Sequence, residues 1–264
     1  MLPTRFTITS VNGAGLAWAR RDGVRQIAVV LGAFAAYELA RLAMKPDWAA
    51  ATANARKIVD LEHVLSLSWE RPLQDWFVRD LPDLVRAMNI FYFVGHFVLT
   101  GLFFLWLYHR SRDGFRVFRN GFLVATAIAV FIHWRFPTAP PRLAEADILD
   151  TLRLFSGIDI GSPTSTALSN PVAAVPSLHA GYAVGVGIGL VRYARSNWMK
   201  ALGVVYPFAV ALTIVVTGNH FVIDALAGVA VMALGFAVMG TFRTAIGRRG
   251  TAILDRATRG GAVR

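Results

Sequence analysis

The stretch that decides the fold is GNHFVIDALAG, residues 218–228. It joins two apolar stretches, at roughly 199–217 and 219–242. Each of them has about the 20 residues that a helix needs to cross the hydrocarbon core of a bilayer. Because only Gly218 and Asn219 separate the two, the sequence predicts a tight helical hairpin in a membrane.

The rest of the chain is as apolar as this hairpin. Its 264 residues are 55% hydrophobic with a mean hydropathy of +0.50, which is far from an ordinary soluble domain. Four more apolar stretches of suitable length lie at roughly 24–44, 87–108, 115–134 and 178–194. We therefore predict an all-α, polytopic membrane protein, with six transmembrane helices bundled in a single domain of residues 1–264. The first stretch follows a polar segment and is expected to remain as a span.

The connection between the first two predicted spans, roughly 45–86, contains an amphipathic piece. Its residues are Arg56, Ile58, Val59, Leu61, Glu62, Val64 and Leu65. Apolar side chains on one face and polar ones on the other predict a helix that lies along the membrane interface.

The net charge of +11 has a distribution that is not typical of nucleic-acid binding. Most Lys and Arg residues fall near the N-terminus, in 110–119, in 192–200 and from 243 onward. By the positive-inside rule this pattern predicts that both termini are cytoplasmic. We expect a bacterial plasma membrane, membrane lipids as partners and no nucleic acid. Cysteine is absent, so a disulfide, a thiolate nucleophile and a cysteine-ligated metal are excluded.

Under this topology the loop 135–177 and the 218–219 turn face the extracytoplasmic side. They carry three polar segments: 135–142, 176–179 and 220–224. Ionisable side chains at bilayer depth are expensive and are therefore functional candidates.

The segment around Pro176 enters the fourth predicted span. Free backbone N–H groups at a helix start form an anion site, and His179 falls in this first turn. Alternatively, Ser177 only caps the helix and His179 packs against a neighbour.

His220 and Asp224 are four residues apart and therefore share one face of the last helix. The Asp224 carboxylate can accept from one imidazole nitrogen and leave the other as a nucleophile. Alternatively, the two form a polar pair that holds helices together. Gly228, one turn further on, would allow close helix packing.

The segment RFPTAPPR, residues 135–142, places two guanidinium groups at the ends of a stiff, proline-rich spacer. The planar fork of arginine suits phosphate oxygens and keeps its charge. Alternatively, Arg135 is an anchor at the end of a span.

Taken in order, these segments resemble the type 2 phosphatidic acid phosphatase superfamily. The signature of that family runs Lys-x6-Arg-Pro, Pro-Ser-Gly-His and Ser-Arg-x5-His-x3-Asp. This chain has Arg135-x6-Arg142, Pro176-Ser177-Leu178-His179 and His220-x3-Asp224. Leucine in place of glycine, together with Asn89-x2-Tyr92-x3-His96 in the second span, looks like the inositol phosphorylceramide synthase branch. The resemblance covers about 56–228.

The resemblance implies a role for each matching residue. His220 would be the nucleophile, Asp224 its orienting partner and His179 the acid for the leaving group. The phosphate would be held by Arg135, Arg142 and the backbone at Ser177 and Leu178. The reaction would be metal-independent, would need no cofactor and would pass through a phosphohistidine to water or an alcohol.

The chain also departs from the family pattern. Ile214 stands where the third motif has arginine, Leu143 replaces the first-motif proline, and Arg135 replaces lysine. Asn219 is either a substitute donor or a helix cap. The candidates for the headgroup pocket are Asn89, Tyr92, His96 and Asn219, although the first three could instead bridge helices.

The resemblance implies a lipid phosphate substrate: phosphatidic acid, a polyprenyl phosphate or a phosphoinositide-like donor. A phospho-headgroup transferase acting on a lipid or polyol alcohol is one alternative, and a non-catalytic lipid-binding scaffold is another. Two histidines and an aspartate could also bind iron or zinc. The loop 143–175 is long enough to cover the site or select an acceptor.

Overall fold

The computed structural model describes residues 13–145, 147–159 and 170–260, with side chains described between Arg21 and Thr241. It divides into two compact units, Met1–Ala43 and Met44–Arg264. The first unit contains helix α1 (Gly13–Ala43), in which Arg41 pairs with Glu38 at 2.6 Å. Many of its large apolar side chains are exposed, which is typical of a helix that faces lipid.

Five helical stretches within the described residues are long and apolar enough to cross a membrane. They are Arg21–Ala43, Pro82–Arg110, Arg112–Arg135, Asn197–Val216 and Val222–Thr241. The second stretch is built from α4 (Pro82–Ile90), a π-helical turn η1 (Phe91–Gly95) and α5 (His96–Arg110). The others correspond to α1, α6 (Arg112–Arg135), α11 (Asn197–Val216) and the first half of α12 (Val222–Gly260). The chain is thus an all-helical protein whose long apolar helices fit an integral membrane protein, as predicted.

The fourth predicted span, 178–194, forms a helix of almost the predicted length, but this helix is short for a membrane span. Helix α10 (Leu178–Tyr193) has 16 residues, or about 24 Å at 1.5 Å per residue, against a hydrocarbon core of about 30 Å. It begins where Ser177 caps it and ends before Ala194. The structure therefore does not confirm the predicted count of six.

Helix α10 lies inside the bundle, against α5, α6, α11 and α12. Its glycines allow this close packing: a Cβ at Gly189 would clash with the Phe103 ring, and one at Gly187 with the carbonyl oxygen of Gly203. Around it, Phe118, Phe122 and other aromatic side chains fill the main apolar core. Small residues on one helix and large ones on its neighbours give the close packing of a protein interior.

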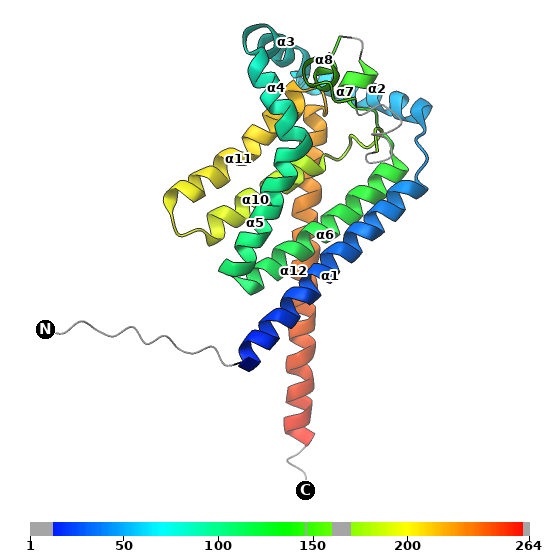
Figure 1. Ribbon diagram of the computed structural model, residues 1–264. Helices are drawn as coiled ribbons and strands as arrows, with labels where there is room; N and C mark the ends of the chain where they lie inside the picture. Colours follow the sequence, from blue (N-terminus) through cyan, green and yellow to red (C-terminus); the bar gives the residue numbers. More distant parts are fainter. Residues whose placement is uncertain (1–12, 146, 160–169, 261–264) are drawn as a thin grey trace, which may run out of the picture. The chain divides into compact units, whose positions relative to one another are not determined.

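Four shorter helices gather at one end of the second unit: α2 (Trp48–Leu65), α3 (Glu70–Asp80), α7 (Pro141–Ala144) and α8 (Thr151–Ser156) (Figure 1). Helix α2 contains the predicted amphipathic piece and begins earlier, where Asp47 caps it. Its buried face packs against the segments around Ala139 and Phe221. Among the described residues the only strand-like pairing is a single parallel bridge between Thr138 and Ala173.

Candidate active site

The predicted polar segments 176–179 and 220–224 meet in the structure, and Arg142, at the end of segment 135–142, joins them. The meeting point lies where α7, the first turn of α10 and the α11–α12 connection come together. The ring centroids of His179 and His220 lie 5.8 Å apart, although the two residues come from different helical elements. Arg142 donates its backbone N–H to Gly218 at 3.0 Å, which places α7 directly beside the His220 turn. Gly218 has a φ of 67°, a conformation that glycine adopts without steric cost.

The His220 ring is oriented by two acceptors. Its Nδ1 lies 3.0 Å from the backbone oxygen of Ala174 and 3.3 Å from Asp224 Oδ2. Since both partners can only accept, Nδ1 must carry the proton and Nε2 keeps the lone pair. The same Asp224 oxygen accepts from the backbone N–H of Phe221 at 2.9 Å, so the carboxylate is itself held in place.

Burial lowers the pKa of His220 to about 3, and the positive charge of Arg142 acts in the same direction. Only 5% of this residue is exposed. A charged imidazolium is disfavoured in such surroundings, so His220 is neutral near pH 7. A neutral, oriented imidazole is the form that can attack phosphorus.

His179 faces His220 from the first turn of α10. Its ring stacks on Tyr92 at 4.4 Å and lies 4.9 Å from the ring of His96. It hydrogen-bonds the backbone of Tyr92, which belongs to the π-helical turn η1. The buried Nε2 of His179 finds no partner among the described residues. This nitrogen is thus available to exchange a proton with a ligand.

The guanidinium of Arg142 is buried and held from two sides. Its Nη1 donates to Asn219 Oδ1 at 2.6 Å, and its Nε lies 3.6 Å from Asp150 Oδ2. Asn219 in turn donates to Thr217 Oγ1 at 2.7 Å. In this structure Asn219 therefore orients Arg142.

The start of α10 is tied to α12. Ser177 Oγ caps α10 by accepting from Ala180 N at 3.3 Å, and its backbone N–H donates to the Asp224 carbonyl at 2.9 Å. A Cβ at Gly228 would clash with the Ser177 carbonyl oxygen, so only glycine permits this approach. The backbone N–H groups of Leu178 and His179 find no acceptor in the described part of the chain and remain for an anion.

Arg135 is not brought to this group of residues. It ends α6, its side chain is exposed, and its guanidinium lies 5.5 Å from the Trp134 ring centroid. A role for Arg135 in phosphate binding stays a prediction.

The three candidates in the second span separate into two groups. Tyr92 and His96 lie next to His179, as described. Asn89 is fully buried: its Nδ2 donates to Thr151 O at 2.8 Å and to Ser156 Oγ at 3.0 Å, and its Oδ1 accepts from Thr151 at 2.9 Å. Its amide thus anchors α8, while its predicted place in the headgroup pocket is not tested.

Sequence reasoning missed several buried polar residues around this site. Tyr206 hydrogen-bonds His96 Nδ1 at 2.9 Å. Glu62 and Glu70 accept from the first backbone N–H groups of α12. Glu62 had a visible signal, because it follows Ile58 by four residues on the apolar face of α2. Tyr206 had no such signal, because the residues next to it in α11 are apolar.

Ile214 occupies the position where the family pattern has arginine. Its side chain is 1% exposed and belongs to the apolar core. Its carbonyl accepts from the backbone N–H groups of Asn219 at 3.0 Å and His220 at 3.1 Å. The residue therefore shapes the turn through its backbone, and Arg142 supplies the guanidinium beside His220.

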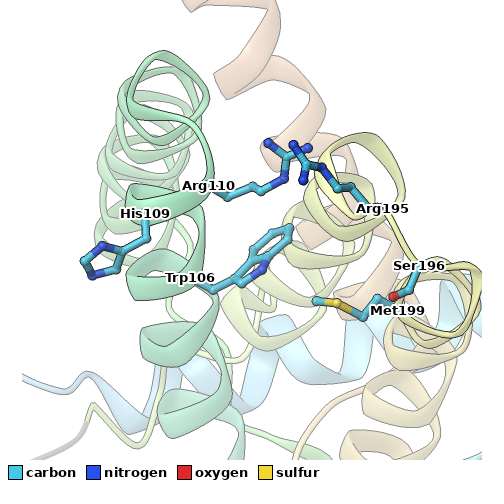
Figure 2. Close-up of a pocket in the computed structure, with 6 residues that line it drawn as sticks. All are labelled: Trp106, His109, Arg110, Arg195, Ser196 and Met199. Carbon is cyan, nitrogen blue, oxygen red and sulfur yellow. The ribbon is translucent and has the colours of Figure 1, made fainter. Parts of the chain in front are cut away.

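In the described ranges no group of three His, Cys, Asp or Glu side chains is arranged to hold a metal ion. An open cavity of about 520 Å³ lies elsewhere, at the far end of α5 (Figure 2). Its lining residues are Trp106, His109, Arg110, Arg195, Ser196 and Met199. From His96 to Arg110 the helix rises by about 21 Å, so this cavity is not part of the candidate active site.

Comparison with known proteins identifies the family. A family model described as the PAP2 superfamily matches residues 56–238. No curated protein and no solved structure matches the chain. The matched range includes every helix that contributes to the paired histidines, Asp224 and Arg142, and it covers more than half of the chain. The chain belongs to the PAP2 superfamily.

Proposed function

We propose that this protein is an integral membrane lipid-phosphate phosphatase or phosphotransferase that acts through a phosphohistidine. Members of the PAP2 superfamily are phosphatases and phosphotransferases. The observation that carries the proposal is the His220 ring, oriented by Asp224 and Ala174, with His179 5.8 Å away and Arg142 beside it.

In the first step His220 Nε2 attacks phosphorus while the bond from phosphorus to the lipid oxygen breaks. The negative charge of the bound phosphate favours protonated His179. It gives its Nε2 proton to the departing alkoxide, because an unprotonated alkoxide is a poor leaving group. The negative charge of the phosphoryl oxygens is met by Arg142 and by the free N–H groups at Leu178 and His179.

In the second step water or an alcohol attacks the phosphohistidine. His179, now neutral, takes the proton of the attacking hydroxyl, and the bond between phosphorus and nitrogen breaks. The products are inorganic phosphate when water attacks and a new phosphate ester when an alcohol attacks. His220 returns to its neutral, Nδ1-protonated form, so both steps balance without a further reactant.

We further propose the arrangement of the chain in the membrane. Helix α10 lies within the bundle among α5, α6, α11 and α12, so it completes a set of six spans in spite of its length. Helix α2 then lies at the membrane interface, both termini are cytoplasmic, and the site faces the extracytoplasmic side of a bacterial plasma membrane. The excess of Lys and Arg in the opposite connections supports this orientation.

Trapping the phosphoenzyme tests the proposal. With a lipid phosphate labelled in its phosphoryl group, His220→Gln should abolish both turnover and labelling. His179→Gln should still become labelled, but about 10² to 10⁴-fold more slowly, because labelling requires the lipid alkoxide to leave. His109→Gln, an exposed histidine at the far end of α5, is the matched control. Activity in all three variants equal to the parent would refute the mechanism.

The identity of the substrate requires a product assay. Phosphatidic acid, a polyprenyl phosphate and an inositol-bearing donor should be compared, each with and without inositol or another polyol as acceptor. Release of phosphate alone indicates hydrolysis, and a new phosphoester indicates a headgroup transferase. If no lipid yields either phosphate or a new phosphoester, the result favours a non-catalytic scaffold. Inhibition by vanadate with no effect of chelators would exclude the metal-enzyme alternative.

A further inference from the structure

The start of helix α12 is capped by carboxyl groups from three different elements. The backbone N–H of Phe221 donates to Asp224 at 2.9 Å, that of Val222 to Glu70 at 2.8 Å, and that of Ile223 to Glu62 at 2.8 Å. Consecutive free N–H groups at a helix start need acceptors, and negative charge there is favourable. Helices α2 and α3 thus hold the start of α12, the helix that carries Asp224 and begins two residues after His220.

The two glutamates are almost entirely removed from water. Glu62 is 2% exposed and Glu70 is 6% exposed. Burial raises the pKa of Glu62 to about 8, and the neighbouring Glu70 carboxyl, which lies within hydrogen-bonding reach, adds to this effect. Two buried carboxylates in contact cannot both ionise cheaply. At neutral pH Glu62 therefore keeps its proton, which it can donate to Glu70.

Among the described residues no cation neutralises this pair. Asp224, the charged group that approaches it from α12, is also acidic. On α2, Arg56 and Lys57 are exposed and His63 bonds Ser68. On α3, Arg71 pairs with Asp147 and Asp75 in solvent, while Arg142 on α7 is engaged by Asn219 and Asp150. By keeping one proton, Glu62 and Glu70 thus avoid two buried negative charges.

We propose that Glu62 and Glu70 are positioning residues: as a carboxyl pair that shares one proton they hold the start of α12, and with it His220 and Asp224, in the reactive arrangement. Loss of the shared proton would make the two carboxylates repel and would release at least one N–H group of α12. The expected effect on catalysis rests on the proposed function. The capping of α12 by Glu62 and Glu70 does not.

The direction of the pH effect follows from the raised pKa of Glu62. The stabilising contribution is fully present below the ordinary pKa of the group, 4.5, and is lost as the pH rises through about 8. The unfolding temperature of the parent protein should therefore fall as the pH rises from about 4.5 to about 8, whereas its phosphatase activity should fall near pH 8, where Glu62 loses its proton in the folded protein.

Glu62→Gln is the decisive variant, because its amide oxygen can accept from Ile223 and its NH₂ can donate to Glu70 without titrating. At about pH 6 its activity should stay within about twofold of the parent. Its activity should not decline near pH 8, and the fall in unfolding temperature between about pH 4.5 and 8 should be absent. Glu62→Leu removes the cap and should lose about tenfold or more in kcat with little change in KM. Asp60→Asn, on the exposed face of α2, should keep the parent profile.

The proposal is overturned if Glu62→Gln retains the alkaline decline of the parent, or if Glu62→Leu matches the parent in kcat. Should Glu62→Leu not fold, Glu62→Gln and Glu70→Gln still decide the matter. Thermal unfolding against pH, together with the infrared carbonyl band of a protonated carboxyl group, requires no substrate. Loss of that band and of the pH dependence in Glu62→Gln would support the shared proton even if the parent shows no phosphatase activity.

Discussion

At the scale of single residues, four of the five buried side-chain atoms that have no hydrogen-bond partner in the described part of the protein lie at the site. They are Asp224 Oδ1, His179 Nε2, His96 Nε2 and Arg142 Nε, and the fifth, Ser196 Oγ, lies at the cavity at the far end of α5. An unpaired buried polar atom costs about 1–3 kcal/mol, so such atoms are rare in folded proteins. Their concentration around one pair of imidazoles is what a site for a phosphate group requires.

The two arginines of the first motif should differ in importance. Arg142→Gln should lower kcat/KM by about 100-fold, because a buried and oriented guanidinium stabilises charge that develops on the phosphoryl group. Arg135→Gln should cost less than tenfold, since this side chain is exposed at the end of α6. Steady-state kinetics of both variants on one lipid phosphate checks this. An equally large loss in Arg135→Gln would mean that Arg135 reaches the phosphate.

Asp224→Asn should weaken the orientation of His220. Phe221 N–H and His220 Nδ1 share one carboxylate oxygen, so an amide oxygen in that place leaves a buried NH₂ without an acceptor, and an NH₂ in that place can accept from neither group. We expect a loss of about 10² to 10⁴-fold in phosphoenzyme formation. The unfolding temperature should fall by only a few degrees, and Asp113→Asn on an exposed face serves as the control. Normal labelling in Asp224→Asn would contradict the orienting role.

At the scale of elements, the site depends on how closely α10 and α12 approach. A Cβ at Gly181 would lie 2.8 Å from the Gly228 carbonyl oxygen, and one at Gly228 would meet the Ser177 carbonyl. Both obstacles are backbone atoms, which cannot rotate away. Because Gly181 and Gly228 have no Cβ, α10 and α12 can approach closely enough to bring His179 near His220.

Gly228→Ala should push these helices apart. We expect destabilisation of about 1–3 kcal/mol, as for other insertions into a packed interior, together with loss of most activity. Gly101→Ala is the matched control, because a Cβ there meets nothing within 4 Å and alanine favours a helix. Thermal unfolding and kinetics of the two variants provide the comparison. Equal stability and activity of Gly228→Ala and Gly101→Ala would show that α10 and α12 can move apart without cost.

The segment 147–156 is held by amide side chains of α3 and α4. Gln74 accepts from Leu149 N at 2.6 Å and donates to Leu149 O at 3.1 Å and to Val216 O at 3.0 Å. Asn89 holds α8 in the same way. The segment carries Asp150, which pairs with Arg142, so its attachment is linked to the guanidinium beside His220.

Gln74→Ala should loosen this segment without unfolding the bundle. Loss of its hydrogen bonds should destabilise the protein by about 1–3 kcal/mol. Limited proteolysis should then cut within 147–156 faster than in the parent. Arg71→Ala, which removes only exposed ion pairs with Asp147 and Asp75, should leave the cutting rate nearly unchanged. Identical rates for Gln74→Ala and the parent would show that other contacts hold the segment.

At the scale of the whole molecule, the proposed topology can be tested directly because the chain has no cysteine. Asp83, at the start of α4, has a side chain that is 90% exposed. Asp113, at the start of α6, has a side chain that is 88% exposed. In intact cells a membrane-impermeant thiol reagent should label Asp83→Cys, on the side of the site. Asp113→Cys should react only after permeabilisation. The reverse pattern would place the active site in the cytoplasm.

The sequence by itself determined the helical membrane class, the hairpin at Gly218 and the pairing of His220 with Asp224. These features depend on span length, turn residues and spacing along one helix, which are local properties. The sequence also identified His179 as a candidate through a short motif. It placed α10 to within one residue, at 178–194 against Leu178–Tyr193, but it counted this stretch as a membrane span although the helix is only about 24 Å long.

Only the tertiary structure decided which polar side chains meet. It separates Arg142, buried beside His220, from Arg135, exposed at the end of α6, although the two looked equivalent in the motif. It also brings Glu62 and Glu70 from preceding helices onto the first turn of α12. The physical reason is that a buried carboxyl, imidazole or guanidinium group needs a partner, and the partners here come from distant parts of the chain that only packing brings together.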